Sequence, residues 1–429
     1  MKTAPPIGLA GPATGLEGLI REARRRQRRR WLAGGVAIAA VLASGAGIIA
    51  GSGAGNRPGP PGRHVTATAP SHASRPSAAR LAGLALPGIA MTVVMWPAGS
   101  PAFGPHSGPP AYVDNLSSGR LSRRQIPGIV GCDCQPYLID VGNQLVYVGS
   151  GGTAAVSPDL RGKPRVLGTT EFFAPSASAH HVWLVRFLGG YLGQGPVRTW
   201  SVPLDGGPAG PPLTLPAGAN LLIRGTAAGF LMQGRPGQVY RLALWSPGSA
   251  PRSLPYSPAN GISDGFDATA RLIAYGTGCQ VRETAPKVGS NGYDVCTMLR
   301  VLDVVTGRLR SFGPPPGTAG WTPDGFNTAS AVSAGGRLIA AYALKGSPRQ
   351  GRVGLYVIHL GSSGRVTAVP KSASLLPAAT AWSANGSWLL YQGHGRHLWA
   401  YQVATGKVRT SSTPCCQYAV LATAPDHSG

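Results

Sequence analysis

The sequence predicts an all-β fold, a β-propeller of about seven blades that follows one transmembrane helix and a disordered linker. Three observations predict it. A sequence pattern of short apolar strands and glycine turns recurs along most of the chain. Gly (63) and Pro (40) together make up nearly a quarter of the 429 residues, which is typical of many strands joined by turns, and 43% hydrophobic residues still allow a core. An uncharged stretch near the start follows a run of arginines.

The amino-terminal elements predict a membrane anchor. Residues 31–54 carry no charge, and as a helix they would span about 36 Å against a hydrocarbon core of roughly 30 Å. The cytoplasmic segment, residues 1–30, contains eight Lys/Arg and two Glu. Positive charge beside an apolar span stays in the cytoplasm. The sequence therefore predicts a single-pass protein of the cell membrane, with its amino terminus inside and the rest outside. The arginines that set this topology are Arg24, Arg25, Arg26, Arg28, Arg29 and Arg30.

Two other interpretations of this region are open. The small residues around 50–55 are also suited to cleavage of a signal peptide. Arg28-Arg29-Arg30-Trp31-Leu32 loosely fits a twin-arginine export signal. All three interpretations take the remaining chain out of the cytoplasm. Residues 55–88 are rich in Pro, Ala, Ser and Gly without apolar patterning, so we expect a disordered linker.

The repeat fills residues 89–429, the predicted extracytoplasmic propeller. Its clearest copy spans 380–410, with strands expected at 379–383, 387–392, 397–403 and 407–411 and a hairpin turn at Thr405-Gly406. Other copies lie at 91–128, 143–167, 181–207, 229–254, 271–312 and 336–369. Four strands at this period are the signature of propeller blades. The first copy lacks one strand, and we expect residues 417–429 to supply it and close the ring.

Two short sequence motifs resemble those of known proteins. The turn pattern W-S/T-x-D/N-G is present at 321–325 and 382–386, and a strand pair with T-G in its turn follows. In these motifs, residues 90–428 resemble the TolB-type and WD-repeat-like propellers of bacteria, with Asn385 where an Asp is expected. The amino-terminal layout resembles membrane proteins of actinobacteria, some of which regulate sigma factors. The resemblance implies the fold only, because propellers serve as scaffolds, binding proteins and enzymes.

The six cysteines predict disulfides, since their number is even and the compartment is oxidising. Cys279 and Cys296 flank what we expect to be a long loop between two strands, and a bridge there closes about 18 residues. Cys132 and Cys134 enter the second blade, and Cys415 and Cys416 precede the proposed closing strand. Bridges between these two pairs would lock the ring, with partners left open. A soft-metal site is the alternative; we predict no metal and no cofactor.

No catalytic residue is predicted, and we favour a protein that is not an enzyme. Gly261-Ile262-Ser263-Asp264-Gly265 matches a nucleophile elbow, but a strand rather than a helix follows it, so a turn is expected. The histidines at 180, 181, 359, 394 and 397 have no carboxylate close in sequence that would complete a metal site. Asp205 and Asp303 occupy positions typical of turns, and the two repeat-equivalent tryptophans, Trp321 and Trp382, indicate packing between blades.

Charge and loop length indicate the class of function. Residues 31–429 contain 31 Lys/Arg and 13 Asp/Glu, about +18, which favours anionic partners such as lipid headgroups or wall polymers. No nucleic-acid recognition motif is present, so nucleic acid is not expected. We predict a binding scaffold for a protein or ligand at the cell envelope, with specificity in the loops at 98–110, 188–197, 280–295 and 344–352. The alternatives are an envelope sensor that signals like an anti-sigma factor through its short cytoplasmic segment, and a secreted propeller hydrolase or lyase.

Overall fold

The computed structural model describes eighteen segments of the chain. They are residues 83–97, 110–126, 138–142, 144–149, 152–157, 159–170, 172–189, 195–234, 241–255, 266–282, 293–322, 331–333, 335–346, 352–361, 364–374, 380–392, 397–412 and 418–425. The chain divides after Ala79 into two parts, and all described residues belong to the second. The topology arginines, the predicted span at 31–54 and most of the linker lie outside the described residues. Within those residues, no helix has the length and apolar character needed to cross a bilayer.

The predicted all-β class is confirmed, because every regular element of the described residues is a strand. These strands form five four-stranded sheets and one eight-stranded sheet, all antiparallel. The first sheet has the order β28-β1-β2-β3 and combines the two ends of the described chain: β1 (Met91–Pro97), β2 (Pro110–Asn115), β3 (Arg120–Gln125) and β28 (Tyr418–Pro425).

The other sheets follow the chain in order, four strands at a time. The next three are β4 (Leu138–Val141), β5 (Gln144–Gly149), β6 (Gly152–Val156) and β7 (Arg165–Gly168); β8 (Phe172–Pro175), β9 (His181–Phe187), β10 (Val197–Pro203) and β11 (Leu213–Thr214); and β12 (Ala219–Thr226), β13 (Gly229–Gly234), β14 (Arg241–Trp245) and β15 (Arg252–Ser253). We call each such group of four strands a quartet.

The eight-stranded sheet consists of two quartets. They are β16 (Phe266–Ala268), β17 (Leu272–Arg282), β18 (Tyr293–Asp303) and β19 (Leu309–Phe312), then β20 (Thr318–Thr322), β21 (Leu338–Lys345), β22 (Arg352–His359) and β23 (Val366–Ala368). A single residue pair, Cys296 with Trp321, joins β18 to β20. The last sheet contains β24 (Thr380–Trp382), β25 (Trp388–Gln392), β26 (Leu398–Gln402) and β27 (Val408–Thr410).

These last four strands confirm the clearest repeat, since each lies inside its expected range and is one residue shorter at one or both ends. The β26–β27 hairpin shows why the T-G motif of the repeat specifies this structure. Gly406 has a φ of 72° and donates its N–H to the carbonyl of Gln402. Gly307 has a φ of 71° and bonds Asp303 in the same way at the β18–β19 hairpin. A glycine at this position allows the left-handed turn that returns the chain to the sheet.

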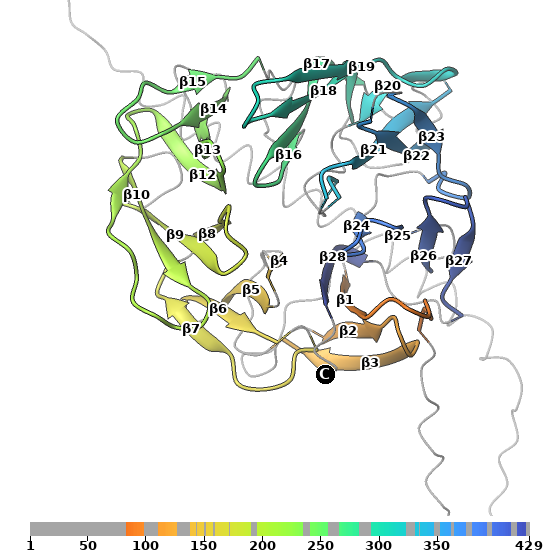
Figure 1. Cartoon of the computed structure of the whole chain (residues 1–429), viewed down its shortest axis with the longest axis horizontal. Coiled ribbons are helices and arrows are strands. Elements are labelled where there is room, and N and C mark those ends of the chain that lie inside the picture. Colours follow the sequence, from red (N-terminus) through yellow and green to blue (C-terminus); the bar gives the residue numbers. More distant parts are fainter. Residues whose placement is uncertain are drawn as a thin grey trace, which may run out of the picture. The chain divides into compact units, whose positions relative to one another are not determined.

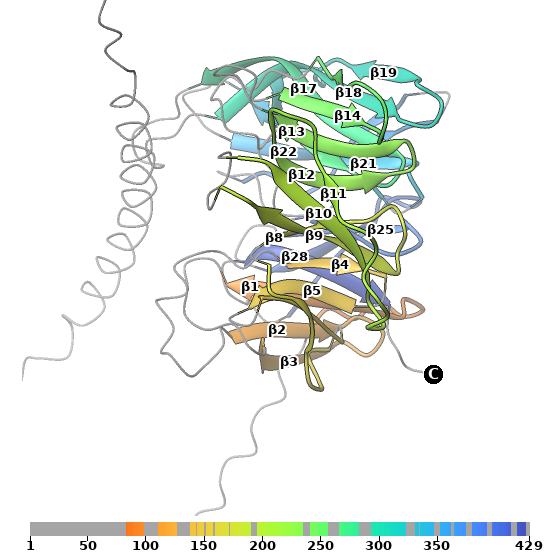
Figure 2. The same ribbon diagram turned by 90° about the vertical axis from the view of Figure 1, so that its left-hand side faces the viewer.

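The sheets stand side by side around a ring, which is the arrangement of a β-propeller (Figure 1). Figure 1 shows β4, β8 and β28 nearer the centre and β3, β7 and β27 at the periphery. In the view turned by 90°, the strands run across the thickness of the ring (Figure 2).

The core lies between the sheets. Each cluster of buried apolar side chains combines residues of successive quartets; for example, Val146 packs with Leu184, and Leu299 packs with Ile339. A four-stranded antiparallel quartet has two apolar faces here, so it needs a neighbour on each side. The series returns to its start, because Met91 of β1 packs in one cluster with Leu390 of β25.

Ring closure joins the two ends of the described chain. β28 runs antiparallel to β1 from Met91–Pro425 to Pro97–Tyr418, so the carboxyl-terminal strand completes the first sheet as predicted. Residues 83–86 extend the closure: the N–H of Leu86 donates to the carbonyl of Leu116, and the side chains of Leu84 and Leu86 are 2% and 1% exposed. The sequence placed 83–88 in the linker. They pack on the propeller instead, because burial of two leucines stabilises by about 2 kcal/mol each.

The two repeat-equivalent tryptophans connect neighbouring quartets. The indole N–H of Trp321 donates to the carbonyl of Phe312 at 3.0 Å, and that of Trp382 donates to the carbonyl of Ala331 at 2.9 Å. Both rings are buried. Their shared position in the repeat therefore corresponds to a shared role in packing between quartets.

A carboxylate is buried at the closure. Asp114 of β2 is 0% exposed and lies opposite Val93 and Leu121. Its Oδ2 accepts the N–H of Leu84 at 2.7 Å, while its Oδ1 has no hydrogen-bond partner among the described residues. Burial raises the pKa of Asp114 to about 6, and the Leu84 N–H opposes that shift. Ionisation of this group therefore works against folding.

Removal of β28 should prevent folding of the propeller. Deletion of residues 418–429 leaves the paired edge of β1 without a partner and opens the ring. We expect no cooperative thermal transition by circular dichroism and aggregation on purification. Deletion of 426–429 alone, which leaves β28 intact, is the control and should keep the wild-type melting temperature. Equal melting temperatures for both truncations would contradict the closure.

Replacement of Asp114 by Asn should change how stability depends on pH. A carboxyl whose pKa rises from 3.8 to about 6 on folding is ionised at pH 7 at a cost of about 3 kcal/mol, and this cost vanishes below the unfolded-state value. Between pH 4 and pH 7 the wild type should therefore lose stability relative to Asp114→Asn. Denaturant titrations across that range measure the difference, and parallel curves for the two proteins would rule out this role for Asp114.

Candidate functional site

One end of the quartets collects the tight hairpin turns. Because neighbouring strands are antiparallel, the turn between the first and second strands and the turn between the third and fourth strands lie at the same end of each sheet. We call this end of the ring the turn face. It also holds the start of the described chain, since the N–H of Gly83 donates to the carbonyl of Gly119 in the β2–β3 turn.

An arginine-lined groove of about 330 Å³ lies on the turn face between quartets β16–β19 and β20–β23. We call it the arginine groove. Its charged lining is Arg271, Asp303, Arg308, Arg310 and Arg337; its apolar lining is Leu272, Val301 and Leu360, and Gly335 and Gly336 complete it. The three apolar side chains are buried core residues, whereas Arg271, Arg308 and Arg337 are exposed. The groove therefore has an apolar floor and a cationic rim.

Both oxygens of the Asp303 carboxylate in the groove accept hydrogen bonds. Oδ2 of Asp303 accepts hydrogen bonds from Nε and Nη2 of Arg271 at 2.9 and 2.8 Å, and Oδ1 accepts the N–H groups of Val305 and Thr306. The hydrogen bond from Arg271 holds the pKa of Asp303 below its usual value. Asp303 thus stays ionised, shapes the hairpin as the sequence predicted, and orients Arg271 at the rim.

The repeat explains why arginines meet here. Arg271 and Arg337 occupy the same position in successive quartets, directly before the second strand. The carbonyl of Arg271 accepts the N–H of Val304, and the carbonyl of Arg337 accepts the N–H of Leu360. In the β24–β27 quartet the equivalent residue is Ser387, whose carbonyl accepts the N–H of Val403. The backbone is therefore common to the repeat, and the arginines are particular to these two quartets.

The groove arginines divide into two roles. Nη1 of Arg310 donates to the carbonyl of Gly361 in the next quartet at 3.3 Å, as Nη1 of Arg409 does to Ala85 at the closure. Arg310 therefore also connects quartets. Across the part of the chain that the structure describes, the side chains of Arg308 and Arg337 form no hydrogen bond or ion pair and so are available to a ligand.

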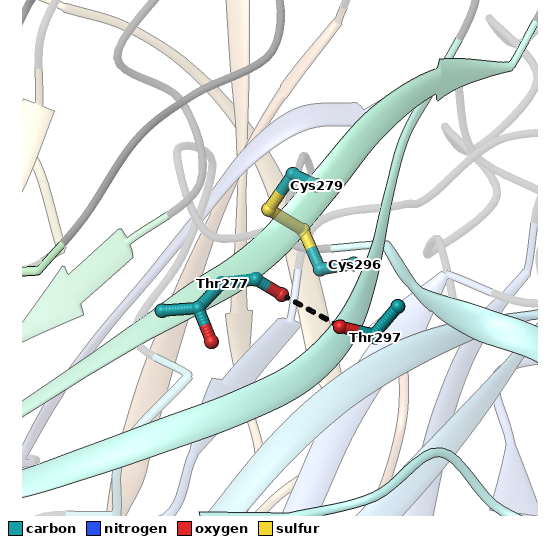
Figure 3. Close-up of a disulfide and its surroundings, with 4 residues drawn as sticks. All are labelled: Thr277, Cys279, Cys296 and Thr297. Carbon is teal, nitrogen blue, oxygen red and sulfur yellow. Dashed lines mark hydrogen bonds between the residues drawn. A yellow bond between two sulfur atoms is a disulfide. The ribbon is translucent and has the colours of Figure 1, made fainter.

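The structure brings Cys279 and Cys296 together (Figure 3). Their sulfur atoms lie at disulfide distance, and the two residues are register partners in β17 and β18. The sequence placed them at the ends of a loop, but both strands continue three residues further, to Arg282 and from Tyr293. Cys296 is 0% exposed and shares a cluster with Trp321, so the bridge lies beside the junction between the two quartets. Cys132, Cys134, Cys415 and Cys416 lie outside the described residues.

Most of the remaining sequence candidates have structural partners or lie outside the described residues. Nδ1 of His397 lies 2.9 Å from the carbonyl of Ser411, and Nε2 of His359 lies 3.4 Å from Nη2 of Arg365. Asp205 accepts the N–H of Gly207 within its turn. His394 and the 261–265 turn are not described, and the four predicted specificity loops fall mostly outside as well. Within the described segments, no group of His, Cys, Asp and Glu is suited to a metal ion.

A half-buried carboxylate that the sequence did not single out is also structural. Asp267 of β16 accepts the N–H of Val332 at 3.0 Å and that of Ala268 at 2.8 Å. Burial raises its pKa, and these N–H groups and the charge of Arg224 oppose the shift. Arg224 of β12 in turn donates to the carbonyl of Ala268 at 2.9 Å. Three successive quartets meet in this network, which favours a role in holding them together.

Sequence reasoning missed the arginine groove, although it found the excess positive charge. Two sequence features indicated the groove. Arginine recurs at one repeat position, 271 and 337, and the hairpin motif T-G-R-L-R at 306–310 adds two more arginines. Aligning the copies by their glycines would have shown these side chains converging at one end of two neighbouring blades.

Solved structures similar to this one include known propellers. The chain matches the β-propeller domain of Cps50 (Swd1) from Myceliophteria thermophila at 12% identity and a TM-score of 0.40, covering 68% of this chain and 90% of that one. It matches the WD40 domain of Pan2 from Neurospora crassa at 11% identity and a TM-score of 0.40, covering 73% and 85%. No protein-family model and no curated protein matches the sequence. The fold assignment therefore rests on the strand order and ring described above.

Loss of the disulfide should destabilise the propeller without changing its fold. The bridge closes a segment with a sequence separation of 17, which corresponds to about 3 kcal/mol. We expect Cys279→Ala/Cys296→Ala to unfold at lower denaturant concentration while keeping the β-sheet spectrum. The matched control is wild type under strong reductant, which should shift by a similar amount. A double variant as stable as oxidised wild type would contradict this contribution.

Proposed function

We propose that this chain is a membrane-anchored extracytoplasmic propeller that acts as a binding scaffold for an anionic component of the cell envelope. The seven quartets are its blades, with β28, β1, β2 and β3 forming the blade that closes the ring. The uncharged stretch at 31–54, preceded by arginines, supports the anchor. A cystine in the fold favours an oxidising compartment.

The observation that carries this proposal is the arginine groove on a closed ring. Closure fixes every blade against two neighbours, so turns from different blades keep constant positions relative to each other. Such turns form a pre-organised surface, which lowers the entropic cost of binding. Four arginines against one engaged aspartate give that surface a net charge of +3 at this place. Anionic ligands are attracted to it, and salt should weaken the attraction.

A topology and binding experiment tests both halves of the proposal. Full-length protein carrying an amino-terminal and a carboxyl-terminal tag is expressed in cells, and protease is added outside. We expect loss of the carboxyl-terminal tag and protection of the amino-terminal tag, and retention in the membrane after an alkaline wash.

The same protein, purified in neutral detergent, should sediment with washed envelope fragments at low salt and progressively less as salt rises. A carboxyl-terminal tag protected from outside protease in intact cells would contradict the predicted topology. No binding to envelope fragments at low salt would contradict the scaffold function.

A further inference from the structure

We propose that the arginine groove is a phosphate-binding subsite, which takes a phosphate ester group of an anionic envelope polymer and bridges two blades through Arg308 and Arg337. This inference rests on the proposed scaffold function and names the ligand chemistry of that scaffold.

The charge balance of the groove favours a ligand of high negative charge. Asp303 already has both oxygens occupied, by Arg271 and by two backbone N–H groups. Arg310 has one donor committed to the carbonyl of Gly361. Arg308 and Arg337 have no carboxylate partner among the described residues. An oxyanion placed between them would compensate charges that the protein leaves uncompensated.

Geometry favours phosphate over a carboxylate. Arg308 comes from the β18–β19 hairpin and Arg337 from the turn before β21, so the two guanidinium groups approach the groove from different blades. A carboxylate has two oxygens in one plane and is satisfied by one planar guanidinium. A phosphate ester presents two or more charged oxygens in a tetrahedral arrangement, so it accepts hydrogen bonds from both arginines at once.

The floor and one wall of the groove suit an ester rather than a bare ion. Leu272, Val301 and Leu360 provide an apolar floor that packs against the carbon chain between phosphate groups. Gly335 lines the same groove, and a Cβ added there would meet no atom within 4 Å. The glycine therefore leaves open space beside the groove lining, into which a larger side chain would extend.

The shape of the groove separates a polymer from a lipid surface. Its apolar floor lies below an exposed arginine rim, between two quartets. A flexible chain of phosphate esters can follow this floor from one quartet to the next, whereas the planar surface of a bilayer contacts only the rim, where Arg308 shares a hairpin with Val305, which is 59% exposed. We therefore assign the ligand to the polymer, with the lipid headgroup as the competing source of the same chemistry.

The experiment measures binding of full-length protein, transferred from neutral detergent into phosphatidylcholine nanodiscs, to three probes at matched ionic strength. They are a soluble glycerol phosphate oligomer, a polygalacturonate oligomer of equal charge, and phosphatidylcholine vesicles containing phosphatidylglycerol. The groove variant is Arg308→Gln/Arg337→Gln. The control variant, Arg120→Gln/Lys163→Gln, removes the same charge from exposed residues near other turns of the same face. Gly335→Leu adds an apolar side chain at the groove lining without changing the charge of the groove.

We expect the groove variant to weaken binding of the phosphate oligomer about tenfold or more, and the control variant less than about threefold. Gly335→Leu should weaken it as well, which a purely long-range attraction would not predict. Equal losses in the two double variants, tighter binding of the carboxylate oligomer, or binding to vesicles alone would each overturn the assignment. If the groove variant binds envelope fragments as well as wild type does, the phosphate subsite is wrong and the scaffold function stands. If wild type does not bind the fragments at all, the scaffold function itself is wrong.

Discussion

The structure depends on the pairing of β28 with β1. Each quartet buries apolar side chains on both faces, so a linear row of quartets would expose one apolar face at each end. The β28–β1 ladder removes those ends, because the first and last strands of the described residues form one sheet that packs against β4–β7 on one side and β24–β27 on the other. Leu84 and Leu86 complete the same junction. With this ladder in place, every quartet is packed between two neighbours.

Closure also explains how a repeat made mostly of apolar strands and glycine turns can carry a distinctive charged surface. The quartets share a backbone pattern, visible in the equivalent bonds at Arg271, Arg337 and Ser387. Substitution at a shared position changes the turn face without changing the fold. Two neighbouring quartets carry arginine there, and the hairpin of the first adds Arg308 and Arg310. The arginine groove is thus produced by local variation in side chains on a constant framework.

Much of the fold could be predicted from the sequence because its signals are local. Apolar runs bounded by glycines marked strands such as β25 and β26, and the position of residues 417–429 after a complete repeat predicted the closing strand. The groove could not be predicted in the same way, because Arg271 and Arg337 are 66 positions apart and meet only through the packing of two blades. Asp114 was missed for a related reason. Its burial depends on residues 83–86, whose composition resembles a linker but whose two leucines fill the closure cluster.

Native-state hydrogen exchange most directly tests the claim that the ring is closed by its own ends. Amides of β28 and β1 take part in one antiparallel ladder, so peptides covering 91–97 and 418–425 should exchange slowly and open together, at the rate of global unfolding. Rapid exchange throughout 418–425 while the other strands stay protected would show that the ladder does not form, and the account of a closed propeller would be wrong.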